Sequence, residues 1–280
     1  MSLVGQLPKL CLVVSPPSGH NDVRVAVDCN ALTEQNRNFP DFYITPPQPC
    51  PYLPGRRERK VFTHLTNDKP PGAVDQLLRT GFRRSQNIAY TPYCDGCNAC
   101  VSVRILVDQF DPGRTFRRTL DRNRDLIAER ASPEPSQEQY ALFRDYIDSR
   151  HGDGGMADMS VLDYTMMVQN TLAQTHLTEY RQRQPGSLPS EFYKWPLLGV
   201  SLCDRLTDGI SMVYSYYDPE AADRSLGTYM ILEQIQQARK LGLPYLYLGY
   251  WVRGSRKMSY KSRYQPQEHL TQNGWIRVLP

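Results

Sequence analysis

The sequence lacks any run of about 18 consecutive apolar residues, which a membrane-spanning helix needs. Its first residues, 1–14, also lack the charged flank and the small-residue cleavage pattern of a secretory signal. Neither membrane insertion nor export is therefore expected, and the predicted location is the cytoplasm. The P-loop, G-x-G-x-x-G, H-E-x-x-H and G-x-S-x-G patterns are also missing, which removes the best-marked kinase, dehydrogenase, zinc-protease and hydrolase classes.

What the sequence does contain suits a globular protein. Its 280 residues are 40% apolar and 22% charged, which is enough for one sizeable core or for two modest domains. The formal net charge of +4 is small for this length, so local clusters of charge are more informative than the total. Seven cysteines in a reducing compartment argue against a disulfide framework.

Three of the cysteines, Cys94, Cys97 and Cys100, are spaced C-x-x-C-x-x-C on a loop that leads into a strand. Thiolates at this spacing can reach one metal, and tetrahedral zinc or an iron–sulfur cluster then needs a fourth ligand. Cys50 is the first choice, because the proline-rich segment 46–54 around it cannot form a regular helix or a central strand and needs a tether. Cys29 and a histidine such as His64 are the next candidates. The alternative is that these are buried reduced cysteines, which pack like small apolar residues.

The pattern of apolar residues predicts a mixed fold with strands and helices. In the N-terminal part, we predict strands at 23–27, 41–44, 88–92 and 101–107, a short helix at 73–80, and helices at 115–131 and 137–149. Ser136 and Gln139 form a capping box that starts the last helix. The C-terminal third predicts a hairpin of strands 197–206 and 210–217, a helix at 226–241, and a strand at 245–251 that runs parallel to the second hairpin strand.

Two groups of basic residues stand out. A predicted helix carries the first, and the more informative second group lies in a stretch from 249 to 267 without any acidic residue. Cations interleaved with aromatic rings can neutralise phosphates and stack on bases, as single-stranded RNA binding requires. The predicted polyanion contacts are Arg253, Arg256, Lys257, Tyr260, Lys261 and Arg263. The first group, Arg114, Arg117, Arg118, Arg122 and Arg124, fits a solvated face better, because neighbouring aspartates can pair with it.

Three segments are familiar: the one around Cys50, the stretch 81–105 with the GFRRS and cysteine motifs, and the long block 216–270. They resemble the arginyl-tRNA–protein transferase family, and more narrowly its bacterial aspartate/glutamate leucyltransferase branch. The resemblance covers nearly the whole chain. It implies an α/β fold with a mixed sheet: an N-terminal domain with the cysteine cluster, residues 1–130, packed on an acetyltransferase-like domain, residues 131–280.

The resemblance also implies the substrates, which are leucyl-tRNA as donor and a protein beginning with Asp or Glu as acceptor, marked by leucine for N-degron degradation. Recognition of an acidic chain start needs a cation, for which Arg83 and Arg84 are the first choices, although one of them can instead pair with a carboxylate. Leucine against arginine as the donor group stays open.

The chemistry requires no cofactor, because the aminoacyl ester is already activated. A zinc ion or iron–sulfur cluster would be structural or regulatory. Candidate proton acceptors are Asp218 and Glu233, and candidate hydroxyls for the oxyanion or the departing ribose oxygen are Tyr216, Tyr217 and Tyr229. All five have ordinary structural alternatives. Ser225, Gly227 and Thr228 open a helix whose N-terminus favours negative charge.

Two other classes of function remain. A coenzyme A-dependent N-acetyltransferase would share the C-terminal topology, but the sequence lacks the phosphate-loop glycines expected of it. A non-catalytic, metal-stabilised tRNA-binding module would use the cysteines and the basic stretch, and would bind tRNA without transferring anything.

Overall fold

The computed structural model describes residues 41–67, 69–70, 72–150, 156–169 and 172–278, and the backbone of 10–11 and 23–27. Three sheets organise these residues. The largest has eight strands in the order β10-β11-β12-β13-β14-β9-β15-β16, a six-stranded sheet has the order β1-β2-β3-β6-β8-β7, and β4 pairs with β5. No helix among the described residues is long and apolar enough to cross a membrane.

The elements alternate along the chain in a mixed α/β pattern. The N-terminal elements are β1 (Leu10–Cys11), β2 (Val23–Val27), β3 (Phe42–Ile44), β4 (Gln48–Pro49), β5 (Arg57–Glu58), β6 (Lys60–His64), α1 (Ala73–Arg79), β7 (Arg83–Ser85), β8 (Ile88–Pro92) and β9 (Cys100–Leu106). Next come α2 (Arg114–Arg122), β10 (Leu126–Ala131), α3 (Gln137–Arg150), α4 (Val161–Gln169), β11 (Gln174–Gln182) and the 3-10 helix η2 (Pro189–Lys194). The C-terminal elements are β12 (Leu197–Arg205), β13 (Gly209–Tyr217), η3 (Pro219–Arg224), α5 (Leu226–Lys240), β14 (Tyr245–Val252), η4 (Arg256–Arg263), β15 (Gln267–Thr271) and β16 (Gly274–Val278).

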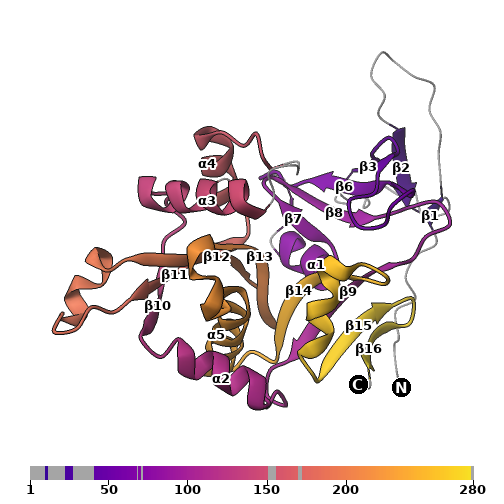
Figure 1. Cartoon of the computed structure of the whole chain (residues 1–280). Coiled ribbons are helices and arrows are strands. Elements are labelled where there is room, and N and C mark those ends of the chain that lie inside the picture. The colour runs from indigo at the N-terminus through magenta and orange to yellow at the C-terminus, as the bar shows by residue number, and fades with distance from the viewer. Residues whose placement is uncertain are drawn as a thin grey trace.

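The large sheet is covered on both faces. Helices α2 and α5 lie on one face, and α3 and α4 lie on the other, beside the six-stranded sheet (Figure 1). Under α5 the core is mainly aliphatic, with Ile231, Leu232 and Ile235 among its members, and also contains Phe110, Phe116 and Tyr264. Under α3 and α4 it is built on Phe143 and Tyr164. A sheet packed on both faces has little exposed apolar area along its central strands, so the site has to form where strands end or separate.

Most predicted elements are confirmed. Helix α5 and strands β8, β9, β12, β13 and β14 lie within a residue or two of their predicted bounds, and β14 runs parallel to β13. The capping box is present, because the Gln139 backbone N–H donates to Ser136 Oγ at 3.1 Å and the Ser136 N–H donates to Gln139 Oε1 at 3.0 Å.

The helix predicted over 115–131 is wrong in its second half. Helix α2 ends at Arg122, and β10 follows and pairs with β11 in antiparallel register. The Asn123 side chain donates to Thr119 O and to Arg224 O, both at 2.8 Å, which fixes the end of the helix against the end of η3. Pairing with β11 then outweighs the helical propensity of residues 126–131.

The large sheet also takes up strands from the N-terminal half of the chain. Strands β9 and β10, both before residue 131 or ending there, belong to the large sheet. Strand β9 lies between β14 and β15, so the chain enters the eight-stranded sheet at Cys100, where β9 begins. The cysteine loop therefore lies at the junction of the two sheets.

Candidate active site

Strands β13 and β14 run side by side only at their beginnings. Their parallel register joins Gly209 with Tyr245, Ile210 with Leu246 and Ser211 with Tyr247. Beyond these pairs β13 continues along β12 up to Tyr217, while β14 continues along β9 up to Val252. The two strands therefore separate, and we call the opening between residues 212–217 and 248–252 the wedge. Backbone groups facing the wedge need partners other than a neighbouring strand.

Arg83 reaches the wedge from β7. Its Nη2 donates to Val213 O of β13 at 2.9 Å. On the other side the guanidinium lies against Gly249 of β14, where an added Cβ would overlap Nη1 and Cζ and lie 2.8 Å from Nε. Gly249 has φ +73°, so glycine satisfies both the backbone conformation and the close approach of Arg83. The Nη1 atom is buried and has no hydrogen-bond partner among the described residues.

Lys261 approaches the same part of β14 from η4. Its Nζ donates to Leu248 O at 2.8 Å and to Tyr250 O at 2.7 Å, and the residue is only 7% exposed. Because β13 has separated from β14 here, its backbone N–H groups do not reach these two carbonyls of β14, and the Lys261 ammonium donates to them instead. Burial lowers the pKa of Lys261 to about 7, and the nearby charge of Arg83 acts in the same direction.

Aromatic side chains surround the open end of the wedge. The Tyr217 ring lies 4.9 Å from the ring of Tyr146 in α3, and it also covers Gly227 at the start of α5, where an added Cβ would lie 3.1 Å from the ring. Tyr260 of η4 is 42% exposed. Burial raises the pKa of Tyr146, and Tyr217, Tyr214 and Tyr260 add to the effect, so the phenol of Tyr146 stays protonated. Neutral rings with an exposed member can stack on a base.

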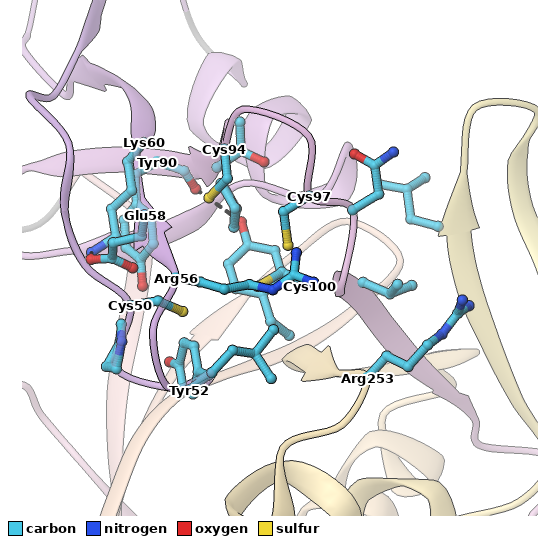
Figure 2. A pocket seen from close by; sticks show the side chains of 18 of the residues that line it. Cys50, Tyr52, Arg56, Glu58, Lys60, Tyr90, Cys94, Cys97, Cys100 and Arg253 are labelled. Atoms are coloured by element: carbon cyan, nitrogen blue, oxygen red, sulfur yellow. Dashed lines mark hydrogen bonds and ion pairs between the residues drawn. The ribbon is translucent and has the colours of Figure 1, made fainter.

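A cavity of about 580 Å³ lies beside the wedge, on the side of the cysteine loop. Cys50, Cys94, Cys97 and Cys100 face it together with Tyr52 and Arg253 (Figure 2), and Tyr250 also lines it. Tyr250 joins the cavity to the wedge, because its side chain lines the cavity and its carbonyl accepts from Lys261 at the wedge. Its hydroxyl donates to Gly81 O at 3.0 Å. Arg56, Arg57 and Lys60 also line the cavity. Its lining is therefore rich in cations.

The thiols gather but do not form a ligand set. Among the residues that the structure describes, no group of three or more His, Cys, Asp or Glu side chains is arranged to hold a metal ion. Burial raises the pKa of Cys100 to about 12, with Cys94, Cys50 and Cys97 adding to the effect, so this thiol is protonated as placed. The ring of His64 packs against Tyr43 and Phe62, and Cys29 lies outside the described residues. The metal site stays a prediction, and no chemical step below passes through it.

Two sequence profiles of one protein family match this chain. The profile described as "Arginine-tRNA-protein transferase, N terminus" matches residues 48–118, and the profile described as "Arginine-tRNA-protein transferase, C terminus" matches residues 138–271. The chain belongs to the arginine-tRNA-protein transferase family. The wedge, η4 and α5 all lie within the second match, whereas Arg83 and the four cysteines lie within the first.

Within this family the chain is similar to proteins named aspartate/glutamate leucyltransferase. The protein from Xanthobacter autotrophicus is 60% identical over 88% of this chain and 99% of its own length. The one from Azorhizobium caulinodans is 58% identical over the same shares. Among solved structures, "Crystal structure of FemX" has a TM-score of 0.47 at 11% identity and covers 79% of this chain and 71% of that chain. "The structure of L-PGS from Bacillus licheniformis" has a TM-score of 0.42 at 14% identity and covers 60% and 57%. Both scores are too low to support a conclusion about this chain.

The structure separates the two arginines predicted to recognise an acidic chain start in this family member. The Arg84 side chain is fully buried and forms a bidentate ion pair with Asp204, at 2.7 and 2.9 Å. It joins the two sheets, which is the structural alternative that the sequence left open. Arg83, by contrast, has no carboxylate partner among the described residues and faces the wedge.

The predicted catalytic residues are only partly brought together. The Tyr216 hydroxyl is buried and lies 2.6 Å from the Tyr164 hydroxyl, within the α3–α4 layer. Tyr229 donates to Leu126 O at 3.4 Å, and Glu233 accepts from Gln237 at 2.9 Å, both away from the wedge. Tyr217 is at the wedge. Asp218 follows it, with a carboxylate that accepts from the Glu220 N–H at 2.9 Å.

The predicted polyanion contacts also divide into two sets. Five of them are exposed, namely Arg253, Arg256, Lys257, Tyr260 and Arg263. The sixth, Lys261, is buried against β14 and cannot meet a phosphate on the surface of η4. At the start of α5, Ser225 is exposed with φ +55°, Gly227 is covered by Tyr217, and Thr228 is half-buried. The contribution of Gly249 was missed, although its position between Leu248 and Tyr250 in a buried strand was a signal for close approach.

Proposed function

We propose that this chain transfers leucine from leucyl-tRNA to the N-terminal Asp or Glu of acceptor proteins, which marks them for N-degron degradation. The observation that carries the proposal is the similarity, over 88% of the chain, to proteins named aspartate/glutamate leucyltransferase. Two features of the site support it: a wedge with a cation that lacks a carboxylate partner among the described residues, and exposed basic and aromatic residues on the adjoining helix η4. Both substrates place the reaction in the cytoplasm.

We further propose that the large sheet is acetyltransferase-like, with the wedge as the place where the acyl group lies. The parallel pair β13 and β14, joined by α5 and separating after three register pairs, supports this interpretation. The carbonyls at Leu248 and Tyr250 are already bonded to Lys261. Lys261 therefore competes for these acceptors with the pantetheine amide of a coenzyme A donor, which disfavours coenzyme A.

The reaction needs positioning more than an additional reagent. The neutral α-amino group of the acceptor attacks the ester carbonyl carbon, a C–N bond forms, and the C–O bond to the tRNA ribose breaks. The proton lost by the amine is taken up by the departing ribose oxygen. An α-amino group has a pKa of about 7.7 to 8.0, so a useful fraction is neutral near pH 7. Orientation in the wedge supplies the main acceleration.

Residues around the wedge have separate roles in this proposal. The Tyr217 hydroxyl stabilises the oxyanion or passes a proton to the ribose oxygen, and Asp218 is the nearby acceptor that takes the amine proton and returns it to that path, so that the ribose oxygen gains the proton the amine loses. Arg253, Arg256, Lys257 and Arg263 contact tRNA phosphates, and Tyr260 stacks on a terminal base. The start of α5, at Ser225, Gly227 and Thr228, favours negative charge beside the ester.

A metal ion or iron–sulfur cluster held by Cys50, Cys94, Cys97 and Cys100 remains a hypothesis about stability or regulation. Elemental analysis of protein purified anaerobically under reducing conditions tests it. We expect about one zinc, or one cluster, per chain, absent from a Cys97→Ser variant. Metal-free wild-type protein with full activity would contradict the hypothesis.

The decisive experiment mixes the purified protein with radiolabelled leucyl-tRNA or arginyl-tRNA and with peptides that differ only in their first residue. We expect leucine transfer to peptides beginning with Asp and Glu, and none to the peptide beginning with Ala. Transfer of arginine would reassign the donor. Binding of leucyl-tRNA without any transfer would favour the non-catalytic module instead.

A further inference from the structure

Arg83 and Lys261 approach one three-residue stretch of β14 from different elements. Arg83 lies against Gly249, while Lys261 donates to the carbonyls of Leu248 and Tyr250 on either side of that glycine. Each cation keeps unused hydrogen-bonding capacity. The Nη1 of Arg83 is buried without a partner among the described residues, and the ammonium of Lys261 has three donors, of which the two carbonyls use two.

The pair is exceptional for its lack of a counter-charge. Among the described residues, three arginines are buried, and each forms an ion pair with a carboxylate shorter than 3 Å. These pairs are Arg84 with Asp204, Arg104 with Glu268, and Arg181 with Glu179. Lys261 is the remaining buried cation, and no carboxylate of the described residues lies within ion-pair distance of it or of Arg83. Burying unpaired cations is costly, and an anion bound between them would offset the cost.

We propose that Arg83 and Lys261 together form the binding site for the side-chain carboxylate of the acceptor's first residue, with Lys261 in the place that the sequence assigned to Arg84. This inference rests on the function proposed above. It identifies which two cations determine the preference for Asp and Glu.

A carboxylate fits this site better than a phosphate does. The exposed cations of η4 are available to the tRNA backbone, whereas Lys261 is almost inaccessible to a bulky phosphodiester. The planar guanidinium of Arg83 can offer Nη1 to one carboxylate oxygen while Lys261 offers its third N–H. The adjoining cavity is lined by the Tyr250 side chain, and the backbone carbonyl of the same residue accepts from Lys261, so cavity and cation pair meet at Tyr250.

The test compares two peptides that differ only in beginning with Glu or Gln. Their affinities are measured by calorimetry, and leucine transfer is measured at saturating leucyl-tRNA. The proteins are wild type, Arg83→Gln, Lys261→Gln, Lys261→Arg and the control Lys240→Gln, which removes an exposed lysine at the end of α5. We expect Arg83→Gln and Lys261→Gln to weaken binding of the Glu peptide roughly 10- to 100-fold, with little effect on the Gln peptide. Lys261→Arg should retain most of the preference, and Lys240→Gln all of it.

Three results would overturn the inference. One is an equal loss of turnover with both peptides at unchanged affinity, which would assign the cations to the oxyanion of the transfer step. Another is weaker binding of leucyl-tRNA with an unchanged preference for Glu, which would assign them to a phosphate. The third is an unchanged preference in Arg83→Gln, which decides the matter even if Lys261→Gln does not fold. Failure of the proposed function is distinct, because wild type would then transfer leucine to neither peptide.

Discussion

Replacing Gly249 with alanine tests the wedge geometry without changing any charge. The added Cβ would overlap Nη1 and Cζ of Arg83 and lie 2.8 Å from its Nε, so the guanidinium has to move away from Val213 O. The flexible arginine can do so, and the backbone strain is limited. An alanine at φ +73° costs about 1–2 kcal/mol, which still leaves a domain of ordinary stability folded.

Gly254 provides the matched control, because it has φ +83° but an added Cβ there meets only Leu53 Cδ2, at 3.6 Å. Gly254→Ala should therefore lose about 1–2 kcal/mol of unfolding free energy, measured by urea denaturation, and Gly249→Ala should lose this amount plus the contribution of the hydrogen bond from Arg83 to Val213 O. Only Gly249→Ala should lose leucine transfer to a peptide beginning with Glu, by roughly 10- to 100-fold in kcat/KM, since it displaces a charged hydrogen-bond donor. Equal activities of the two variants would refute the role assigned to Arg83.

Three further measurements follow from the same structure. Arg256→Ala and Lys257→Ala should weaken leucyl-tRNA binding. Each should also reduce the magnitude of the slope of log binding constant against log salt concentration by about 0.7 to 0.9 for each phosphate that is no longer neutralised. An unaltered slope would show that these residues do not contact tRNA phosphates. Lys261 faces Arg83 from β7 and the Tyr260 ring within η4, and its pKa is lowered to about 7, mainly by burial. A carboxylate binds the ammonium form of Lys261, so the acceptor KM should be lowest below pH 7 and should rise as the ammonium loses its proton above pH 7. A KM independent of pH would speak against the site. Arg84→Met leaves the buried Asp204 unpaired and should destabilise the fold by about 3–5 kcal/mol in urea denaturation, whereas a destabilisation below about 1 kcal/mol would contradict its role in joining the sheets.

Local sequence patterns predicted the elements whose own residues decide their structure. Helix α5 has apolar residues at helical spacing and a glycine after its end, and its bounds are confirmed. The strand β11 was missed, because its sequence QTHLTEYRQ offers few apolar residues. Its two buried charged side chains bond to distant partners, Arg181 to Glu138 and Glu179 to Gln139. No window of sequence contains those partners.

The candidate site shows the same division. The motifs alone indicated the family and the cysteine cluster, named Arg83 and Arg84 together as candidates, and located the exposed cations of η4. They could not distinguish Arg83 from Arg84, which are adjacent on a strand and point to opposite sides. One meets Asp204, 120 residues away, and the other meets a strand edge that has no partner strand.

The sequence by itself therefore determined the local helices and strands and the kinds of chemical group present. Only the tertiary structure decided which cations are buried, which of those have a carboxylate, and that Lys261 belongs to the wedge and not to the surface. The physical reason is that burial and charge pairing depend on contacts between segments far apart in the chain, whereas propensity, capping and spacing act within a few residues.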